Sequence, residues 1–515
     1  MIRIGVDVGG TNTDAVVMDN ESLLGGVKRP TTADIIGGVR NAIKAALDKT
    51  GTEPDKIDAI MVGTTHFVNA LVERKALSAT GVIRLCLPSG GSLKPFAAWP
   101  LDLVTAVSGQ SELVKGGYEM DGREISQLDR VELMSAVRDL TVSGCTEIAL
   151  STVFATIRNE MELKAAEIIA EEFPDITVTC SSDIGRIGLL ERENAAIINA
   201  SLRPLANNVV TSFASLTSEL GLECPLFFTR NDGTLIEAEE VKRLPVLTFA
   251  CGPTNSMRGA AFLSGLQNAL VVDIGGTTTD VGEIIGGFPR LAGTSVAVAD
   301  VQTNFSMPDV ISVGLGGGSI VRLGAKPSIG PDSVGHQLLQ EGKVFGGQTL
   351  TTSDVAVAAG RADIGTVSPP ELEELEDLLG LVDEIVSDAV ARSRTSSETV
   401  PVLAVGGGSI LMPNEVDGLE VIRPENYGLA NAVGAAIAQV SGEATKIVTL
   451  EGDLSRDQAI AMVEKEAREI AVGRGAQPDT ITVLSKSDVP LAYLPGENLS
   501  ISVTVVGDLS LEDKQ

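Results

Sequence analysis

The feature that most constrains the fold of this chain is a nine-residue segment that occurs twice. Asp7-Val-Gly-Gly-Thr-Asn-Thr-Asp-Ala15 recurs as Asp273-Ile-Gly-Gly-Thr-Thr-Thr-Asp-Val281, with six of nine positions identical and an offset of 266 residues. Each copy follows an apolar, β-branched run and leads into another one. Glycine turns between two such runs are typical of β-hairpins. The repeat therefore predicts two related halves, each beginning with a hairpin whose turn is Gly-Gly-Thr.

The turn of each copy contains groups that bind phosphate. Successive backbone N–H groups in a glycine-rich turn can form a concave anion site, and threonine hydroxyls add donors. Two such turns that face each other would clamp the phosphates of one nucleotide. The predicted contacts are Gly9, Gly10, Thr11 and Thr13 in the first copy and Gly275, Gly276, Thr277 and Thr278 in the second.

Four aspartates flank the two turns. Asp7 and Asp273 stand at strand ends, where they are predicted to hold Mg²⁺ or to position water, and both are candidate catalytic residues. The alternative is that they only stabilise a turn. Asp14 and Asp280 stand just past the turns, and two roles stay open for them: bracing the loop, or acting as base for an attacking water. Asp280 is therefore also a candidate catalytic residue.

A third glycine cluster adds to the prediction of a nucleotide site. Residues 402–405 predict a strand that runs into Gly406, Gly407 and Gly408. Residues 431–440, rich in small side chains, predict a helix after it.

The rest of the chain predicts an α/β protein. Helical periodicity covers residues 35–47, 129–141, 160–172, 191–219 and 371–394, and short apolar strands cover residues 59–62, 81–87, 147–151, 177–180 and 226–229. The glycine run 316–318 is expected to precede a helix that begins at Ser319. After residue 442 the pattern changes to strand, helix and two strands, which predicts a small C-terminal α+β unit. The expected domains are 1–190, 191–442 and 443–515.

Charge and composition argue against several classes of function. Asp and Glu number 69 against 39 Lys and Arg, and the resulting formal charge of −30 repels nucleic acid and acidic membrane surfaces. No apolar run reaches the roughly 18 residues of a membrane-spanning helix, and the first residues lack the apolar core of a signal peptide. Five scattered cysteines and two histidines form no recognisable zinc, iron–sulfur or disulfide pattern. We therefore expect a cytoplasmic protein that binds neither nucleic acid nor membranes.

The order of the motifs resembles that of the actin/hexokinase/Hsp70 superfamily, with 7–14 and 273–280 as phosphate motifs, 402–409 as adenosine motif and 430–436 as connecting helix. Finer matches resemble the hydantoinase A/5-oxoprolinase family. They are Gly63-Thr-Thr-His-Phe-Val-Asn-Ala-Leu-Val-Glu-Arg74, Pro245-Val-Leu-Thr-Phe-Ala-Cys-Gly-Pro253 and Gly314-Leu-Gly-Gly-Gly-Ser-Ile320. The chain departs from the family pattern after His336, where a cysteine-containing segment is missing, so no role of that cysteine is carried over.

The resemblance implies two duplicated actin-like (ribonuclease-H-like) ATPase domains around a nucleotide cleft, with ATP and Mg²⁺ as cofactors. It also implies an ATP-dependent hydrolase that phosphorylates the carbonyl of a cyclic amide or imide and so activates it for ring opening. A separate hydantoinase B-type subunit is the implied partner, in an oligomer. The candidate substrate contacts are Thr65, His66, Asn69, Gly317 and Ser319.

Two other functions use the same fold and motifs. A small-molecule kinase would stop after phosphoryl transfer and release a stable phosphorylated product. An ATP-driven reactivase or chaperone of the Hsp70 type would show slow ATP turnover stimulated by a protein partner. The motifs do not select the ring, so hydantoins, oxoproline, other lactams and imides stay open.

Overall fold

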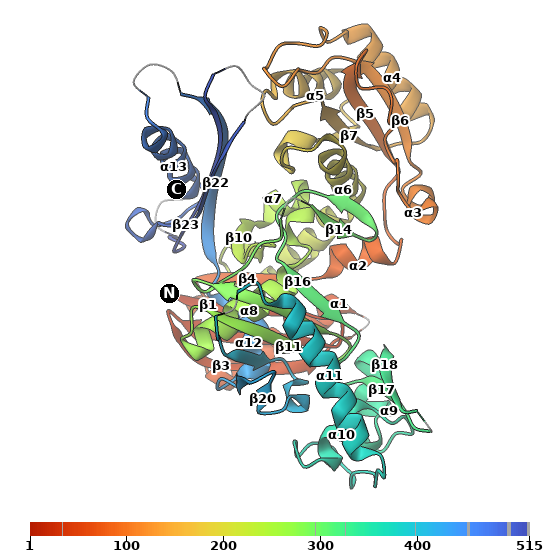
Figure 1. Cartoon of the computed structure of the whole chain (residues 1–515), viewed down its shortest axis with the longest axis vertical. Helices are drawn as coiled ribbons and strands as arrows, with labels where there is room; N and C mark the ends of the chain where they lie inside the picture. The colour runs from red at the N-terminus through yellow and green to blue at the C-terminus, as the bar shows by residue number, and fades with distance from the viewer. Residues whose placement is uncertain are drawn as a thin grey trace.

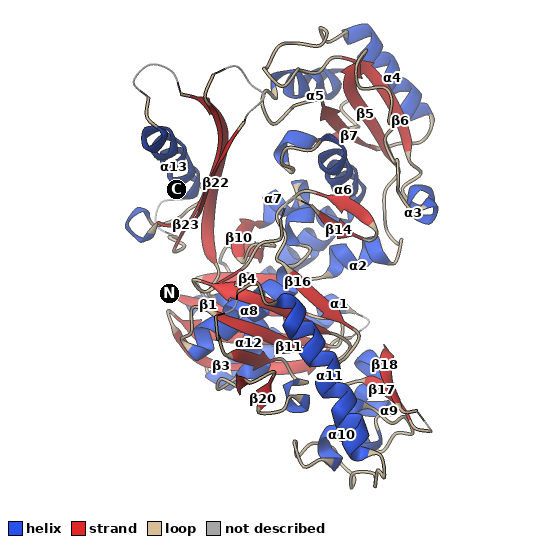
Figure 2. Cartoon of the chain, viewed as in Figure 1, coloured by secondary structure: helices blue, strands red, loops and turns tan. Residues whose placement is uncertain are grey.

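The computed structural model describes residues 1–32, 34–293, 295–324, 326–396, 398–450, 454–491 and 496–511. Figures 1 and 2 show an α/β molecule in which strands and helices alternate around several sheets. The predicted α/β class is confirmed.

The largest sheet has nine strands and contains the first hairpin. The hairpin consists of β1 (Ile2–Val8) and β2 (Asn12–Asp19), and β4 (Ala59–Thr64) pairs parallel with β1. In spatial order the strands are β23 (Thr482–Pro490), β24 (Asn498–Gly507), β22 (Gln439–Thr449), β10 (Thr234–Glu237), β9 (Leu226–Thr229), β4, β1, β2 and β3 (Ser22–Pro30).

The second hairpin lies in a seven-stranded sheet built the same way. It consists of β11 (Ala269–Ile274) and β12 (Thr279–Ile285), and β19 (Val402–Val405) pairs parallel with β11. The other strands are β13 (Phe288–Pro289), β16 (Val310–Val313), β20 (Glu415–Val416) and β21 (Leu419–Ile422). Two hairpins, each with a parallel strand beside its first strand, confirm the predicted pair of related halves.

Two helices lie between the hairpin-bearing sheets and hold them together (Figure 1). They are α8 (Cys251–Ser264) and α12 (Ala430–Ala436), and their backbones touch at glycines. A Cβ at Gly434 would lie 1.8 Å from the Asn255 carbonyl oxygen, and one at Gly259 would lie 1.9 Å from the Ala430 carbonyl oxygen. The helix predicted over 431–440 is wrong at its end: α12 stops at Ala436, and β22 begins at Gln439. Pairing with β10 and β24 stabilises the extended backbone there more than small-residue helix propensity does.

A separate four-stranded parallel sheet forms the upper right of the molecule in Figure 1. Its strands are β6 (Gln110–Lys115), β5 (Thr80–Leu87), β7 (Glu147–Thr152) and β8 (Thr177–Cys180). The helices around it are α3 (Leu101–Ala106), α4 (Arg130–Val142), α5 (Glu160–Glu172) and α6 (Leu189–Glu219).

The remaining α-helices and strands are short, apart from three helices of 16, 19 and 18 residues, which are α1 (Ile35–Thr50), α11 (Leu375–Ser393) and α13 (Arg456–Gly473). The short elements are α2 (His66–Val72), α7 (Ala238–Arg243), β14 (Val296–Val298), β15 (Val301–Thr303), β17 (Ser319–Arg322), β18 (Ser328–Ser333), α9 (Leu338–Glu341) and α10 (Thr352–Ala358). The acidic helix predicted over 371–394 is confirmed over Leu375–Ser393, and residues 371–374 precede it.

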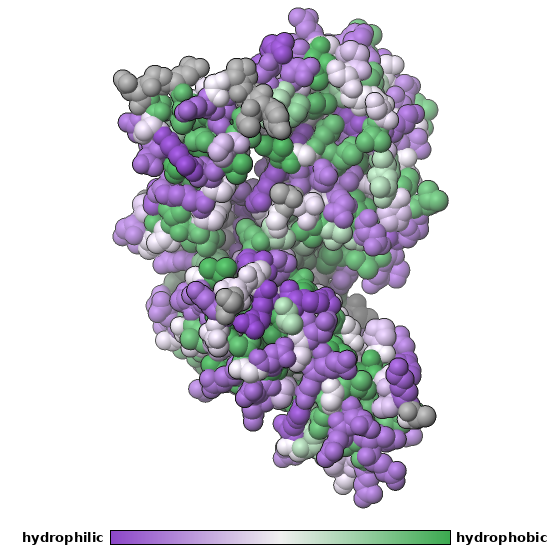
Figure 3. All heavy atoms as spheres, in the orientation of Figure 1, coloured by the Kyte–Doolittle hydropathy of each residue, from purple (hydrophilic) through white to green (hydrophobic). Residues whose placement is uncertain are grey.

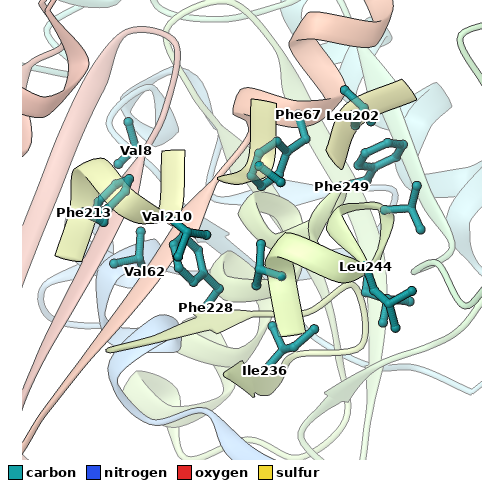
Figure 4. Packing of buried hydrophobic residues seen from close by; sticks show 14 of the residues in the cluster. Val8, Val62, Phe67, Leu202, Val210, Phe213, Phe228, Ile236, Leu244 and Phe249 are labelled. Atoms are coloured by element: carbon teal, nitrogen blue, oxygen red, sulfur yellow. The ribbon is translucent and has the colours of Figure 1, made fainter. Parts of the chain in front are cut away.

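The main core joins the first sheet to α1, α2 and α6. Figure 4 shows Phe67, Phe228 and Phe249, from different parts of the chain, in this one cluster. Figure 3 shows hydrophobic and hydrophilic residues interspersed over the face in view. In the described part of the chain, no helix is long and apolar enough to cross a membrane.

The C-terminal unit predicted from the sequence consists of β22, α13, β23 and β24, and it extends the first sheet. Its side chains Ile501, Val503 and Val505 are fully buried in one cluster with Met61 and Phe227 of the first sheet. The ranges 1–190, 191–442 and 443–515 therefore do not coincide with the sheets, because β9, β10 and β22–β24 complete the sheet that β1 begins. The division of the chain into those three domains stays a prediction.

The hydrophobic cluster that the C-terminal unit shares with the first sheet should contribute to the stability of the whole chain. We expect Val503→Ala to lower the free energy of unfolding by about 2 kcal/mol, because two buried methyl groups leave a cavity. Val483→Ala, on the neighbouring strand and 36% exposed, should change it by less than about 0.5 kcal/mol. Urea unfolding followed by circular dichroism gives both values. A separate early transition in the Val503 variant would show that the C-terminal unit unfolds independently.

Candidate functional site

The two Gly-Gly-Thr turns have the same backbone geometry. In the first hairpin the Gly9 N–H donates to the Asn12 carbonyl over 3.0 Å. In the second the Gly275 N–H donates to the Thr278 carbonyl over 2.9 Å. The sequence repeat is therefore a repeat of structure, closed by the same hydrogen bond.

The turns also touch each other, because residue 276 has no side chain to separate them. A Cβ at Gly276 would lie 2.5 Å from Thr11 Oγ1. The structure thus brings the two halves of the predicted phosphate site together. Of the other predicted contacts, Gly10 and Thr278 are exposed, Gly9, Gly275 and Thr277 are partly buried, and Thr13 is buried beside Thr31.

The aspartates of each hairpin stand directly opposite each other across the two strands. Asp7 pairs with Asp14, and Asp273 pairs with Asp280. Side chains directly opposite in a sheet lie on the same face, so each hairpin presents two carboxylates together. This juxtaposition follows from the strand register.

Helices α8 and α12 each provide an asparagine side chain that bonds one of the aspartates Asp7 and Asp273. Asn255 of α8 donates to Asp7 Oδ1 over 3.4 Å and to Thr229 Oγ1 over 3.0 Å. Asn431 of α12 donates to Asp273 Oδ2 over 3.4 Å. Sequence reasoning did not single out either asparagine. A sequence signal for these two residues did exist. Each is an asparagine within a helix of small residues that follows a segment containing glycine.

Burial dominates the electrostatics of the site. Burial and, next, the charge of Asp14 raise the pKa of Asp7 to about 7, although the Asn255 amide opposes the shift. Burial likewise raises the pKa of Asp14 and of Asp273. Burial raises the pKa of Asp280 to about 6, against a hydrogen bond from Ser312. The cluster therefore has a surplus of poorly solvated negative charge that a cation would offset.

The carboxylates of the site suit a Mg²⁺ ion that also binds water and phosphate oxygens. Among the described residues, no group of three or more His, Cys, Asp or Glu is arranged to hold a metal ion. Mg²⁺ commonly takes one or two carboxylates and completes its shell with water and phosphate oxygens, so such a group is not required. Asp14 Oδ1 is buried and has no hydrogen-bond partner, which leaves an oxygen lone pair available for a water or a cation.

The third glycine motif lies against the second hairpin. The Gly408 N–H donates to the Ile274 carbonyl over 2.7 Å. Gly406 has φ +82°, and a Cβ there would lie 2.1 Å from Asp273 Oδ1, so both its conformation and its surroundings require glycine. Gly407 is exposed. The predicted adenosine motif and second phosphate motif are thus neighbours.

Three candidate substrate residues lie beside the first hairpin. Thr65 precedes α2, His66 begins it, and the exposed Asn69 donates to Thr65 Oγ1 over 3.3 Å. The strand before them approaches Asp7, because a Cβ at Gly63 would lie 2.7 Å from Asp7 Oδ1. Burial lowers the pKa of His66, so its imidazole favours the neutral form.

Asn69, Glu73 and Arg74 do not share one helix face. Helix α2 ends at Val72, and Arg74 has φ +58°, outside the helical region. Arg74 donates instead to Asp102 over 3.1 Å, at the start of α3.

The other two candidates lie in a loop that contacts the second hairpin. The Gly317 N–H donates to the Gly275 carbonyl over 2.9 Å. Ser319 is fully buried, and its hydroxyl accepts from the Gly316 N–H over 2.8 Å. The helix expected to begin at Ser319 is wrong: the residue begins strand β17, whose pairing with β18 outweighs the glycine-turn signal. The side-chain and loop hydrogen bonds of Gly317 and Ser319 in the described structure go to their own loop, to the second hairpin and to α10, not to Thr65, His66 or Asn69.

Cys251, the first residue of α8, is a packing residue. It is fully buried, its thiol donates to the Thr64 carbonyl over 3.2 Å, and burial raises its pKa to about 12. A thiol that stays protonated is a poor nucleophile.

The chain is similar to known protein families and to individual characterised proteins. Residues 3–173 match the family described as hydantoinase/oxoprolinase N-terminal region, and residues 192–369 match the family described as hydantoinase/oxoprolinase. The chain is 27% identical over 398 residues to the acetophenone carboxylase gamma subunit of Aromatoleum aromaticum, covering 69% of this chain and 53% of that protein. It is 25% identical over 464 residues to the caprolactamase subunit alpha of Pseudomonas jessenii, covering 84% and 65%. This chain thus spans about half to two thirds of the length of these relatives.

A solved structure shares the fold over nearly the whole chain. The crystal structure of the ATP-dependent caprolactamase from Pseudomonas jessenii superimposes with a TM-score of 0.75 and 17% identity, covering 99% of this chain and 88% of that one. The two family matches follow each other along the sequence and together take in most of the chain, including both phosphate motifs. This protein belongs to the hydantoinase/oxoprolinase family.

Proposed function

We propose that this chain is the A-type subunit of an ATP-dependent hydrolase that phosphorylates the carbonyl oxygen of a cyclic amide or imide and so activates the ring for opening. The observation that carries the proposal is the contact of two identically closed Gly-Gly-Thr turns at Thr11 and Gly276. Similarity to a caprolactamase subunit supports the substrate class.

The two turns would hold the phosphates of ATP through backbone N–H groups and through the Thr11 and Thr277 hydroxyls. Gly406, Gly407 and Gly408, which adjoin the second hairpin, would receive the adenosine. Asp7 and Asp273 would hold Mg²⁺ with water and phosphate oxygens between them. When bound, Mg²⁺ neutralises charge on the phosphates.

The reaction follows from amide chemistry. Nitrogen donates into a lactam carbonyl and makes its carbon a poor electrophile. Transfer of the γ-phosphoryl group from ATP to the carbonyl oxygen releases ADP and gives an activated imidate-type phosphate. Water then attacks the carbon and the ring C–N bond breaks, which leaves a free amine and an acyl phosphate. A second water hydrolyses the acyl phosphate to the carboxylic acid and inorganic phosphate. The turns stabilise charge on the transferring group, and Asp280 or Asp14 is the candidate base.

The cyclic amide would lie near Thr65, His66 and Asn69, because the strand before them ends beside Asp7. A neutral imidazole at His66 could accept or donate a hydrogen bond at the ring amide. Gly317 and Ser319 would act indirectly, by supporting the second turn.

A B-type partner subunit is part of the proposal. Both relatives named above are subunits, which supports a partner for this chain. Among the residues that the structure describes, the nucleotide motifs are not accompanied by a zinc-type ligand cluster that would hydrolyse the activated ring. We also place the enzyme in the cytoplasm, where its five unpaired cysteines would stay reduced.

One alternative substrate class has specific support. The similarity to an acetophenone carboxylase subunit favours a ketone carbonyl, activated by the same phosphoryl transfer for carboxylation. The two candidates share the first chemical step and differ in the acceptor, so one substrate panel separates them.

We predict that the purified chain alone releases ADP when a suitable lactam is present but forms no ring-opened acid. The assay measures ADP and acid separately over hydantoins, 5-oxoproline, caprolactam and imides, and includes acetophenone with bicarbonate. Acid should appear only after a B-type subunit is added. Acid formed in step with ADP by the lone chain would contradict the partner requirement. A stable phosphorylated product that no added subunit consumes would indicate a kinase.

A further inference from the structure

Lys28, which the sequence motifs do not include, lies in line with the site aspartates. Strand register places Lys28 opposite Asp14, Asp14 opposite Asp7, and Asp7 beside Gly63. Laterally paired residues of neighbouring strands share a face, so this row runs across β3, β2, β1 and β4 on one side of the sheet. Asn255 reaches the same row, where it contacts Asp7.

The second half of the molecule provides an internal comparison. There the corresponding row is Val405, Asp273, Asp280 and Ser312. Ser312 donates its hydroxyl hydrogen bond to Asp280, as Lys28 donates to Asp14. A neutral hydroxyl is therefore enough to brace the second aspartate of a hairpin. The positive charge at Lys28 exceeds what bracing requires.

The ammonium group of Lys28 is placed to do more than pair with Asp14. It has three N–H donors, and Asp14 Oδ2 accepts one of them over 2.5 Å. The side chain is 33% exposed, whereas that of Asp14 is 5% exposed. Its charge acts on the carboxylates of both hairpins, since it lowers the pKa of Asp7 and of Asp273 against the effect of burial.

The positive charge of the Lys28 ammonium would offset part of the negative charge at the site. Four carboxylates surround the two turns in a chain of formal charge −30, and a triphosphate adds further negative charge. Backbone N–H groups and hydroxyls are neutral donors, so the turns alone cannot offset it. A lysine ammonium is a compact point charge that binds phosphate well.

We propose that Lys28 is a catalytic residue whose ammonium contacts the terminal phosphate of ATP while it also bonds Asp14. This inference rests on the proposed binding of Mg²⁺–ATP at the two turns. Its structural alternative is that Lys28 only neutralises Asp14.

The test compares four variants of the full chain. Lys28→Met removes the charge, Lys28→Arg keeps a charge, and Lys28→Met combined with Asp14→Asn removes the need to neutralise Asp14. Lys44→Met, on the exposed side of α1, is the control for loss of a lysine. Calorimetry with Mg²⁺ measures binding of ADP and of a non-hydrolysable ATP analogue, and lactam-stimulated ADP release gives kcat and KM for ATP.

We expect Lys28→Met to weaken binding of the ATP analogue by roughly 10- to 100-fold, the range for a lost charged hydrogen bond, and ADP binding by less than threefold or so. Lys28→Arg should recover most of the affinity, and the double variant should stay as weak as Lys28→Met. Recovery of ATP-analogue binding by the double variant would overturn the proposal, and so would equal losses for ADP and the analogue. If the wild-type chain binds neither nucleotide, the proposed function fails with it; if the wild type binds and Lys28→Met binds equally well, only this inference fails.

Discussion

The Asp7→Asn variant should fold and yet lose the magnesium-dependent part of its ATP affinity, by about 100-fold. Asp7 is buried near the end of β1, where Asn255 donates a hydrogen bond to it and Gly63 lies against its carboxylate. An amide has nearly the same shape but cannot bring a full negative charge to Mg²⁺. Because burial and the charge of Asp14 raise the pKa of Asp7 to about 7, replacing the carboxyl by a neutral amide should cost little stability in the free protein.

The measurement is calorimetry of ATP binding with Mg²⁺ and with EDTA. Asp19→Asn is the matched control, since Asp19 lies at the far end of the same hairpin with its side chain 49% exposed. That control should bind like the wild type. Equal magnesium dependence in the Asp7 variant and the wild type would remove Asp7 from the metal site.

Gly434→Ala is expected to have the largest effect on stability, a loss of about 4 kcal/mol or more. The new Cβ would lie 1.8 Å from the Asn255 carbonyl oxygen, so the backbones of α8 and α12 would have to separate. Asn255 would then move away from Asp7, and nucleotide binding should fall together with stability.

Gly380→Ala is the matched control for Gly434→Ala. Gly380 is also a helix glycine, but a Cβ there meets no heavy atom within 4 Å. Alanine should therefore stabilise α11 by roughly 0.5–1 kcal/mol. Thermal unfolding of both variants tests the difference. A Gly434 variant as stable as the wild type would show that the two helices can move apart at no cost.

Local pattern was enough to predict most of the elements around the site. The helix over 160–172 and the strands over 177–180 and 226–229 match α5, β8 and β9 residue for residue. Apolar periodicity is set by which side chains face the core, and the chain itself carries that information. The two hairpins were predictable for the same reason, with the glycines marking the turns.

Element ends and loop surroundings were less predictable, because contacts from distant residues decide them. Ser319 follows three glycines that could precede either a helix or a strand, and pairing with β18 selects the strand. The helix predicted over 431–440 includes Gln439 and Val440, and pairing with β10 and β24 draws these two residues into the first sheet.

The sequence by itself determined the chemistry of the site: two glycine turns, their threonines and four aspartates, all encoded as a local motif that repeats. Only the tertiary structure decided which groups share that site. Strand register set Asp7 opposite Asp14 and brought in Lys28, and the crossing of α8 and α12 supplied Asn255 and Asn431. Lys28, Asn255 and Asn431 lie 14, 248 and 158 residues from the aspartates that they contact. The asparagine contacts depend on the backbone approach of α8 and α12 at Gly434, which no local pattern encodes.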